Sequence, residues 1–309
     1  LTVFRLRDED QIAVLEMGIS DFGEMTRLTK IAKPDTCVIT NIGTCHLENL
    51  GDRDGVLKAK TEIFQSMKPN GHIVLNGDDD KLITVHEYNG VKPVFFGLNS
   101  ERDVYVDQIE SKGLKGVACR IHLGEDAFDV LVPTPGIHMV YNALAAAAVG
   151  RIYGLTIEEI RRGIESLETI RGRFKMIETD KFLVVDDCYN ANPMSMKASL
   201  DVLHDGEGRR VAILGDMGEL GEDEAALHEG VGTHAATCGI DVCVCVGDLA
   251  VHIAEAAHKV NPDFPVYYEK TRESLLEHLN DYVQKGDTIL VKASHFMKFE
   301  EVVKALEEM

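Results

Sequence analysis

Short apolar runs and longer amphipathic segments alternate along the whole chain. In the first half, residues 12–15, 37–40 and 72–75 form apolar runs that end in polar residues or glycine. Runs of this length between turn residues predict buried strands, and residues 56–67 have the apolar spacing of a helix. Strands that alternate with helices in this way are typical of a parallel sheet in an α/β protein.

The middle of the chain departs from this alternation. Between Val104 and Val132, three short segments of alternating hydrophobicity are separated by glycine, which predicts an antiparallel excursion from the parallel sheet. An alanine-rich helix is predicted over about 139–153. Thr156 and Glu159 then have the spacing of a capping box, in which a hydroxyl and a carboxylate satisfy free amide groups. A further helix is therefore expected to run to about residue 167.

The alternation restarts after Phe174 and continues to the end of the chain. Amphipathic segments separate apolar runs at 182–185, 211–214, 242–246, 266–268 and 288–291. This order predicts a second, Rossmann-like α/β domain. The polar segment 171–173 is the predicted linker, which gives domains of 1–173 and 174–309. The length of 309 residues also favours two domains over one.

Composition and charge narrow the class of protein. A formal net charge of -20 argues against a nucleic-acid partner, because phosphate binding needs a basic patch, whereas small anionic substrates stay possible beside a metal or local cations. The seven cysteines form no CxxC pair, so a reducing cytoplasm is expected, and Cys243 and Cys245 fit small buried side chains on a strand. No apolar run approaches the roughly 20 residues that cross a bilayer, so no membrane span is expected.

Two polar segments directly follow predicted strands. Residues 40–48 (TNIGTCHLE) begin at the end of the predicted strand at 37–40, and residues 187–193 (DCYNANP) follow the strand at 182–185. Open α/β sheets bind ligands in the crevice beyond the carboxyl ends of their strands. Two such places, one in each half of the chain, predict a two-domain enzyme with a cleft between the domains.

Glu16, His46 and Lys60 are candidates for a metal site in the first half. If the strands at 12–15 and 37–40 are neighbours, Glu16 and His46 emerge at the same edge of the sheet. A carboxylate with an imidazole can bind a divalent cation. Taken one at a time, a turn carboxylate, a loop histidine and a solvated helix lysine are the simpler interpretations.

Several segments together resemble a known family. They are LEMG at 15–18, TNIGTCHLE at 40–48, KAKTEIF at 58–64, YNALAAA at 141–147, DDCYNANPMSM at 186–196 and GDMGELG at 215–221. In this order they resemble the Mur ligases of peptidoglycan synthesis, over essentially the whole chain. The resemblance implies an α/β ATPase domain followed by a Rossmann-like ligase domain, and ATP-dependent formation of an amide bond.

Segments 187–193 and 215–221 are the most specific, and they are similar to family members that join D-alanyl-D-alanine (D-Ala-D-Ala) to UDP-N-acetylmuramoyl-tripeptide (UDP-MurNAc-tripeptide). What this implies is phosphorylation of the tripeptide carboxylate by ATP and attack of the dipeptide amine on the acyl phosphate. The products would be the UDP-linked pentapeptide, ADP and phosphate. Mg²⁺ would neutralise the crowded phosphate oxygens. We expect a monomer that binds UDP-MurNAc-tripeptide and D-Ala-D-Ala.

The resemblance also implies roles for single residues in the first half. Glu16 and His46 would hold Mg²⁺. Lys60 matches a family lysine that is carbamylated in several members, which would turn a cation into an anionic oxygen ligand. A carbamate forms on a neutral amine, so the pKa of this lysine would have to be depressed. Asn142 matches a residue close to the adenine, where an amide can both donate and accept hydrogen bonds.

Further implied roles fall at the start of the second domain. Arg173 resembles an arginine that approaches the nucleotide, and Asp187 resembles an acid that faces its ribose or phosphates. Asn190 and Asn192 are similar to residues on the dipeptide side. Asn side chains ahead of a proline also build turns, so this alternative stays open for both.

One feature of the family is not found in the sequence. Mur ligases carry a phosphate-binding glycine-rich loop with a Gly-Lys pair ahead of the strand that ends at Glu16, and this chain has no Gly-Lys dipeptide. The family order would place that loop, and a UDP-binding domain, upstream of Leu1. We therefore expect an incomplete central ATPase domain, and a chain that is inactive or nearly so by itself. A non-catalytic nucleotide-binding or regulatory fragment, or a ligase of the folate polyglutamate or cyanophycin type, are the alternatives.

Overall fold

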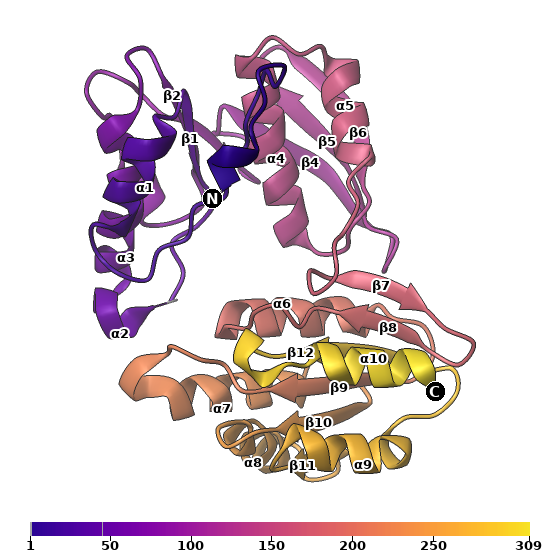
Figure 1. Cartoon of the computed structure of the whole chain (residues 1–309). Helices are drawn as coiled ribbons and strands as arrows, with labels where there is room; N and C mark the ends of the chain where they lie inside the picture. Colours follow the sequence, from indigo (N-terminus) through magenta and orange to yellow (C-terminus); the bar gives the residue numbers. More distant parts are fainter. Residues whose placement is uncertain (1, 45) are drawn as a thin grey trace. The chain divides into compact units, whose positions relative to one another are not determined.

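The computed structural model describes residues 2–44 and 46–309, which contain two six-stranded sheets and their helices (Figure 1). The chain divides into two units. The first comprises the chain up to Val106, with Ile121–Ala127 and Leu144–Ile160. The second comprises the three remaining ranges, Asp107–Arg120, Phe128–Ala143 and Arg161–Met309. None of the helices in the described ranges combines the length and the apolar character that a membrane span needs.

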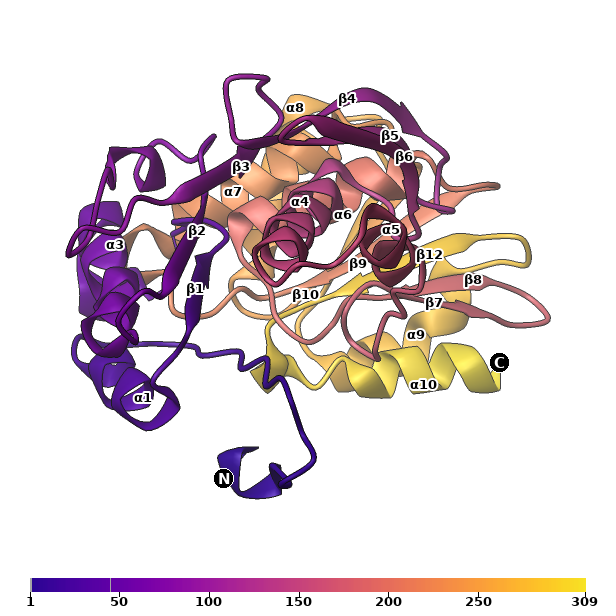
Figure 2. The ribbon, with the colours of Figure 1, turned by 90° about the horizontal axis from the view of Figure 1, so that it is seen from above.

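The first sheet has its strands in chain order. They are β1 (Thr36–Ile39), β2 (His72–Asn76), β3 (Val94–Gly97), β4 (Val104–Ser111), β5 (Val117–Leu123) and β6 (Asp126–Val132). β1 to β4 are parallel, whereas a tight turn at Gly124 and Glu125 joins β5 to β6 as a hairpin (Figure 2). The predicted strands at 37–40 and 72–75 and the antiparallel excursion are confirmed, and β3 was missed.

Helices and short 3₁₀ turns accompany this sheet. They are η1 (Thr2–Arg5), α1 (Glu24–Ala32), α2 (Leu47–Leu50), α3 (Arg53–Thr61), η2 (Glu62–Ser66), η3 (Leu82–Thr84), α4 (Ile137–Ile152) and α5 (Ile157–Glu165). The predicted helix at 56–67 is α3 continued by the tighter η2. The predicted capping box ahead of α5 is confirmed, because the Glu159 carboxylate accepts the amide of Thr156 at 2.8 Å and its hydroxyl at 2.7 Å.

The predicted strand at residues 12–15 is wrong. Residues 11–19 form no helix or strand, and the side chains of Ile12 and Val14 are 69% and 92% exposed. An apolar run becomes a strand where a neighbouring strand takes up its amide and carbonyl groups. β1 pairs with β2, and segment 12–15 belongs to no ladder in the described part of the chain. Glu16 therefore does not cap a strand.

The second sheet has the order β11-β10-β9-β12-β8-β7. Its strands are β7 (Lys175–Glu178), β8 (Leu183–Asp186), β9 (Arg210–Gly215), β10 (Val242–Val246), β11 (Val266–Glu269) and β12 (Thr288–Lys292). β8 to β12 pair in parallel, and β7 runs antiparallel to β8 at the edge. Every strand predicted for the Rossmann-like half is present, and β7 was missed because its residues are only partly buried.

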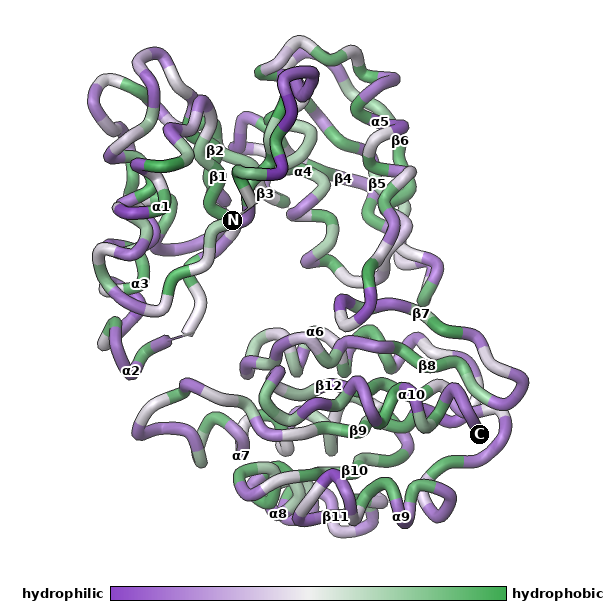
Figure 3. The backbone as a smooth tube through the Cα atoms, viewed as in Figure 1, coloured by the Kyte–Doolittle hydropathy of each residue, from purple (hydrophilic) through white to green (hydrophobic). Residues whose placement is uncertain are grey.

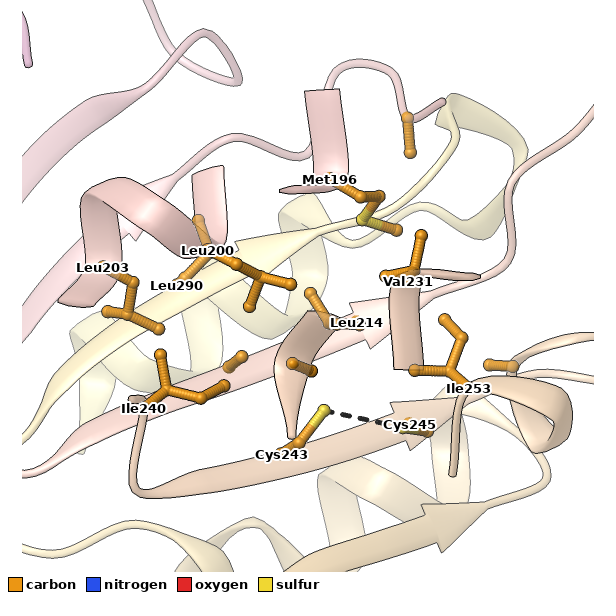
Figure 4. Packing of buried hydrophobic residues seen from close by; sticks show 14 of the residues in the cluster. Met196, Leu200, Leu203, Leu214, Val231, Ile240, Cys243, Cys245, Ile253 and Leu290 are labelled. Carbon is orange, nitrogen blue, oxygen red and sulfur yellow. Dashed lines mark hydrogen bonds between the residues drawn. The ribbon is translucent and has the colours of Figure 1, made fainter. Parts of the chain in front are cut away.

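Helices cover both faces of the second sheet. Those on one face are α6 (Pro193–His204), α7 (Glu224–Ala235) and α8 (Ala250–Val260); those on the other are α9 (Arg272–Tyr282) and α10 (Glu300–Glu308). In Figure 4, Leu200 of α6, Val231 of α7 and Ile253 of α8 gather over Leu214 of β9 and Cys243 of β10. The strands of this sheet are mostly apolar, whereas the helices alternate between apolar and polar residues (Figure 3). The prediction that Cys243 is a buried strand residue is confirmed.

β12 lies between β8 and β9 although it is the last strand in the chain. The helices that follow β8 and β9 pack on one face, and the helix that follows β12 packs on the other. The loop at the carboxyl end of β12 therefore leads to the opposite face of the sheet from the loops that follow β8 and β9. A reversal of this kind opens the crevice in which open α/β sheets bind ligands.

Candidate active site

Asp187 and Lys292 form a shielded ion pair at this crevice. Asp187 follows β8 and Lys292 ends β12, and the Lys292 Nζ lies 2.6 Å from the Asp187 Oδ2. The Asp187 side chain is 15% exposed and the Lys292 side chain is 3% exposed. Lys292 also donates to the carbonyl of Asn190 at 3.1 Å, and the hydroxyl of Ser199 donates to Asp187 at 2.8 Å. These contacts fix one orientation of the Asp187 carboxylate.

His138, near the start of α4, lies in the electrostatic field of this pair. Burial lowers the pKa of His138; Asp187 raises it and Lys292 lowers it further. The imidazole is therefore held largely neutral at physiological pH.

Ser294 joins the loops that follow all three strands. Its hydroxyl accepts the amide N–H of Gly218 at 2.9 Å and donates to the carbonyl of Ala191 at 3.4 Å. Its own amide donates to the carbonyl of Asp216 at 3.0 Å. Ser294 is buried, and its contacts tie the loops after β8 and β9 to the loop after β12, which keeps the carboxyl edge of the sheet in one shape.

Arg173 is held against the same edge by its neighbours. Asp186 accepts the amide of Gly172 at 2.9 Å, and Gly172 in turn accepts the amide of Tyr189 at 3.0 Å. The guanidinium of Arg173 then lies 4.0 Å from the centroid of the Tyr189 ring, which is a cation–π contact. Gly172 has a φ of 77°, a conformation that strains any residue with a Cβ. The predicted linker is thus a clamped turn.

Asn190 and Asn192 both make local backbone contacts. The Asn190 Oδ1 accepts the amide of Ala191 at 2.8 Å. Asn192 is the N-cap of α6: its Oδ1 accepts the amide of Ser195 at 2.9 Å, and its own amide donates to the Ser195 hydroxyl at 3.1 Å. The turn-building alternative is therefore present in the structure for both residues. Asn142 lies on α4, where its exposed amide approaches the Met139 sulfur at 3.5 Å.

In the first unit, Lys60 reaches the loop that follows β1. Its Nζ donates to the carbonyl of Asn41 at 2.8 Å, and the same loop carries His46, which precedes α2 with a φ of 59°. Glu16 is exposed on the segment that forms no strand. In the part of the chain that the structure describes, no three histidine, cysteine or acidic side chains gather as a metal site.

Two charged residues brace this loop and were not predicted. Asp79 accepts the amide of Ile42 at 2.7 Å, and the Nε of Arg53 donates to the carbonyl of Ile42 at 3.0 Å. Arg53 also pairs with Asp80, and this hydrogen bond raises the pKa of the guanidinium. The acidic run that follows β2 therefore fixes the position of the loop rather than leaving it to solvent.

The sequence-predicted residues divide between the two units. Glu16, His46 and Lys60 belong to the first, and the remainder belong to the second, namely Asn142, Arg173, Asp187, Asn190 and Asn192. Sequence reasoning missed the partners that hold the second group, chiefly Lys292 and Ser294. The signal that indicated Asp187 was a polar residue at the end of an apolar strand. Lys292 and Ser294 carry the same signal, because they stand where β12 ends.

Comparison with known proteins identifies the family. Residues 1–150 match the Mur ligase middle domain, and residues 172–295 match the domain described as "Mur ligase, glutamate ligase domain". The UDP-N-acetylmuramoyl-tripeptide–D-alanyl-D-alanine ligase of Bacillus subtilis is 36% identical over 311 residues, which cover 100% of this chain and 67% of the relative. The chain belongs to the Mur ligase family. The enzyme of the same name from Escherichia coli is 35% identical and is covered to 68%.

Solved structures give the same assignment for this Mur ligase chain. MurF from Acinetobacter baumannii superimposes with a TM-score of 0.90 at 32% identity, covering 99% of this chain and 67% of that structure. MurF ligase from Thermotoga maritima in complex with ADP has a TM-score of 0.80 at 28% identity, with coverage of 94% and 65%. The α/β fold predicted from the sequence is confirmed. The chain spans about two thirds of the length of these relatives.

Proposed function

We propose that this chain belongs to an ATP-dependent ligase that adds D-Ala-D-Ala to UDP-MurNAc-tripeptide in peptidoglycan precursor synthesis. The observation that carries the proposal is the 36% identity, over the whole chain, to the B. subtilis enzyme named for that reaction. The T. maritima relative solved with ADP supports ATP as the nucleotide. A cytoplasmic monomer with domains of 1–173 and 174–309 is part of the same proposal.

The proposed reaction has two steps. The γ-phosphoryl group of ATP passes to the terminal carboxylate of the tripeptide, the bond to the β-phosphate oxygen breaks, and ADP leaves. The amine of D-Ala-D-Ala then attacks the acyl carbon, phosphate leaves with the bonding electrons, and the new amide nitrogen loses a proton. The protein contributes mainly by aligning the bound reactants and stabilising charge.

The second unit is proposed to supply nucleotide and dipeptide contacts. Asp187 and Arg173 would face the nucleotide, and Asn190 and Asn192 would face the dipeptide. The contact of Lys292 with Asp187 supports this role, because it holds the carboxylate in one orientation at the end of β8. Asn142 would contact the adenine through its exposed amide.

Glu16, His46 and Lys60 are proposed as the Mg²⁺ ligands, and their chemistry fits Mg²⁺ if Lys60 is carbamylated. Mg²⁺ prefers oxygen donors. Because no three histidine, cysteine or acidic side chains gather as a metal site among the described residues, the proposed ligand set needs an additional source of oxygen. A carbamate on Lys60 would add anionic oxygen next to the loop that carries His46. When bound, Mg²⁺ would neutralise phosphate oxygens.

Mass spectrometry tests the carbamate on Lys60. The protein would be equilibrated with ¹³C-bicarbonate, and carbamates would be trapped by O-alkylation before digestion. We expect label on Lys60 and none on Lys58, which lies on the same helix and is the matched control. A bare Lys60 in saturating bicarbonate would contradict this ligand set.

ADP release tests the proposed function. It would be measured with ATP, Mg²⁺, UDP-MurNAc-tripeptide and D-Ala-D-Ala on the 309-residue chain and on any longer product of its reading frame. In the longer form we expect ADP release that depends on both substrates, and formation of the UDP-linked pentapeptide; the 309-residue chain alone should show little or none of either. Omission of the dipeptide and replacement by glutamate are the controls.

Two results would contradict this function. Consumption of glutamate in place of the dipeptide would favour a ligase of the folate polyglutamate or cyanophycin type. Nucleotide binding without any ligation, in every form of the protein, would favour the non-catalytic alternative. The fold alone does not separate these possibilities, because a folylpolyglutamate synthase superimposes with a TM-score of 0.64 at 19% identity.

A further inference from the structure

The loop that follows β9, residues 216–221, has no role in the proposed mechanism although its sequence is one of the most distinctive in the chain. We call it the β9 loop. Two of its residues, Glu219 and Gly221, have positive φ values of 60° and 72°. Such a backbone needs contacts that hold it in place, because a non-glycine residue with positive φ is disfavoured. The contacts come from α7, α8 and the loop after β12.

The contact from α7 is made by His228, a fully buried histidine. Its Nε2 accepts the amide N–H of Met217 at 2.9 Å, and its Nδ1 lies 2.7 Å from the carbonyl of Glu224. An acceptor at Nε2 and a carbonyl opposite Nδ1 require a proton on Nδ1 and none on Nε2. The geometry therefore selects a neutral imidazole in one tautomer. A protonated ring would place an N–H group against the N–H of Met217.

The surroundings of His228 favour this neutral form. Burial lowers the pKa of the ring, and the charged or titratable groups that face it are Asp216 of the β9 loop, Glu224 of α7 and His252 of α8. Glu224 and Asp216 raise the pKa, His252 lowers it, and burial has the largest effect. Asp216 is itself engaged, since it accepts the amides of Leu249 and Ala250 at 3.1 and 2.7 Å at the start of α8.

The β9 loop is connected directly to the proposed dipeptide edge. Gly218, which follows Met217, donates its amide to the Ser294 hydroxyl, and that hydroxyl donates to the carbonyl of Ala191. Ala191 lies between the two asparagines proposed to face the dipeptide. A shift of Met217 would therefore be passed through Ser294 to the loop after β8.

We propose that His228 is a positioning residue, whose neutral imidazole fixes the β9 loop and through Ser294 shapes the edge that binds D-Ala-D-Ala. The residue touches no reacting atom. We call the hydrogen bond between the Met217 amide and His228 the clamp. The clamp stands on the contacts alone, whereas its effect on dipeptide affinity rests on the proposed function. Acidification through the titration range of His228 then releases the loop and weakens the dipeptide complex.

Three variants test the proposal on the 309-residue chain. His228→Gln places an amide oxygen near the position of Nε2 and does not titrate, whereas His228→Ala removes the acceptor. His234→Gln is the matched control, because His234 lies on the same helix, is 28% exposed and pairs with Asp201 instead. NMR would give the His228 tautomer and the hydrogen-exchange protection factor of the Met217 amide. Calorimetry would give the dissociation constant of D-Ala-D-Ala. Both would be followed from about pH 7.5 down to the pH at which the NMR signals of the His228 ring titrate.

We expect the Nδ1–H tautomer at pH 7.5. In the wild type and in His234→Gln, acidification should lower the protection factor of Met217 and weaken dipeptide binding by about tenfold, as loss of one buried hydrogen bond implies. His228→Gln should keep both values nearly constant, and His228→Ala should show the acid values at every pH. If His228→Ala fails to fold, the comparison of wild type with His228→Gln carries the same information.

The outcomes separate the clamp from the function. Equal protection of Met217 in the wild type and His228→Ala, or a proton on Nε2, overturns the clamp. A clamp with dipeptide affinity equal in all variants overturns the positioning role. If the wild type binds no dipeptide at pH 7.5, the proposed function is at fault, and the Met217 amide still decides whether His228 holds the loop.

Discussion

At the scale of single residues, the Asp187–Lys292 ion pair is the feature in which each residue depends most strictly on its partner. Both charges are withdrawn from water, and the attraction between them offsets the cost of desolvation only while both are present. Ser199 and the carbonyl of Asn190 satisfy further hydrogen-bonding capacity of the pair. Removal of one partner would leave the other as a buried uncompensated charge.

We predict that Lys292→Met lowers the free energy of unfolding by about 3 kcal/mol, because Asp187 loses its cation. Urea unfolding followed by circular dichroism would measure the change. Lys304→Met is the matched control, since Lys304 makes an exposed i,i+4 pair with Glu308, for which about 0.5 kcal/mol or less is expected.

The double variant Asp187→Leu with Lys292→Met tests the cause of that loss. It removes both charges together, so it should recover part of the stability lost in Lys292→Met. A double variant as unstable as the sum of its two single changes would contradict the explanation by an uncompensated charge.

At the scale of elements, α6 begins with a capping box that also lies in the most family-specific segment. Asn192 caps the helix and Pro193 occupies its first turn, where a missing N–H costs nothing. The same asparagine is proposed to face the dipeptide. Stability and ligand binding at this position can be separated, because serine caps a helix as well as asparagine does.

We predict that Asn192→Ala lowers the free energy of unfolding by about 1 kcal/mol and that Asn192→Ser leaves it nearly unchanged. Thr271→Ala, which removes the corresponding cap of α9, is the control for a capping loss away from the proposed site. If Asn192 contacts the dipeptide, Asn192→Ser should weaken D-Ala-D-Ala binding in calorimetry without a loss of stability. Unchanged affinity in Asn192→Ser would leave this residue with a structural role alone.

Strand formation shows how elements depend on their surroundings. Residues 12–15 are as apolar as β2, yet Ile12 and Val14 are exposed and the segment forms no strand, whereas residues 72–76 are flanked by β1 and β3. Periodicity predicts that a segment can form a strand. Whether it does so depends on a partner for its backbone groups, which lies elsewhere in the chain.

At the scale of the whole molecule, the net charge of -20 is the dominant electrostatic property. Repulsion among like charges is stronger in the compact folded state than in the extended chain, and salt screens it. We predict that raising NaCl from about 0.05 to 0.5 M at about pH 8 increases the urea midpoint of unfolding.

The same titration near pH 5 is the control for this prediction. The sequence pI is about 5.0, so the net charge there is small and the effect of salt should shrink. A salt effect of equal size at both pH values would point to ion binding or preferential hydration rather than to screening of net charge.

The sequence by itself determined the type and order of most elements, because the side-chain periodicity that distinguishes helix from strand is local. It also indicated which segments carry chemistry, since polar residues directly after apolar strands mark the edge where such sheets bind ligands. Asp187 was found in this way. The capping box at Thr156 was found from spacing alone, since both of its partners lie within one turn.

Tertiary structure decided what depends on residues far apart in the chain. β12 lies between β8 and β9 because its backbone pairs with both, and this placement brings Lys292 to Asp187 across 105 positions. It decided equally that residues 12–15 form no strand and that His228 and Ser294 hold the β9 loop. A hydrogen bond or ion pair between distant segments leaves no periodic trace in the sequence, so only the folded chain can show it.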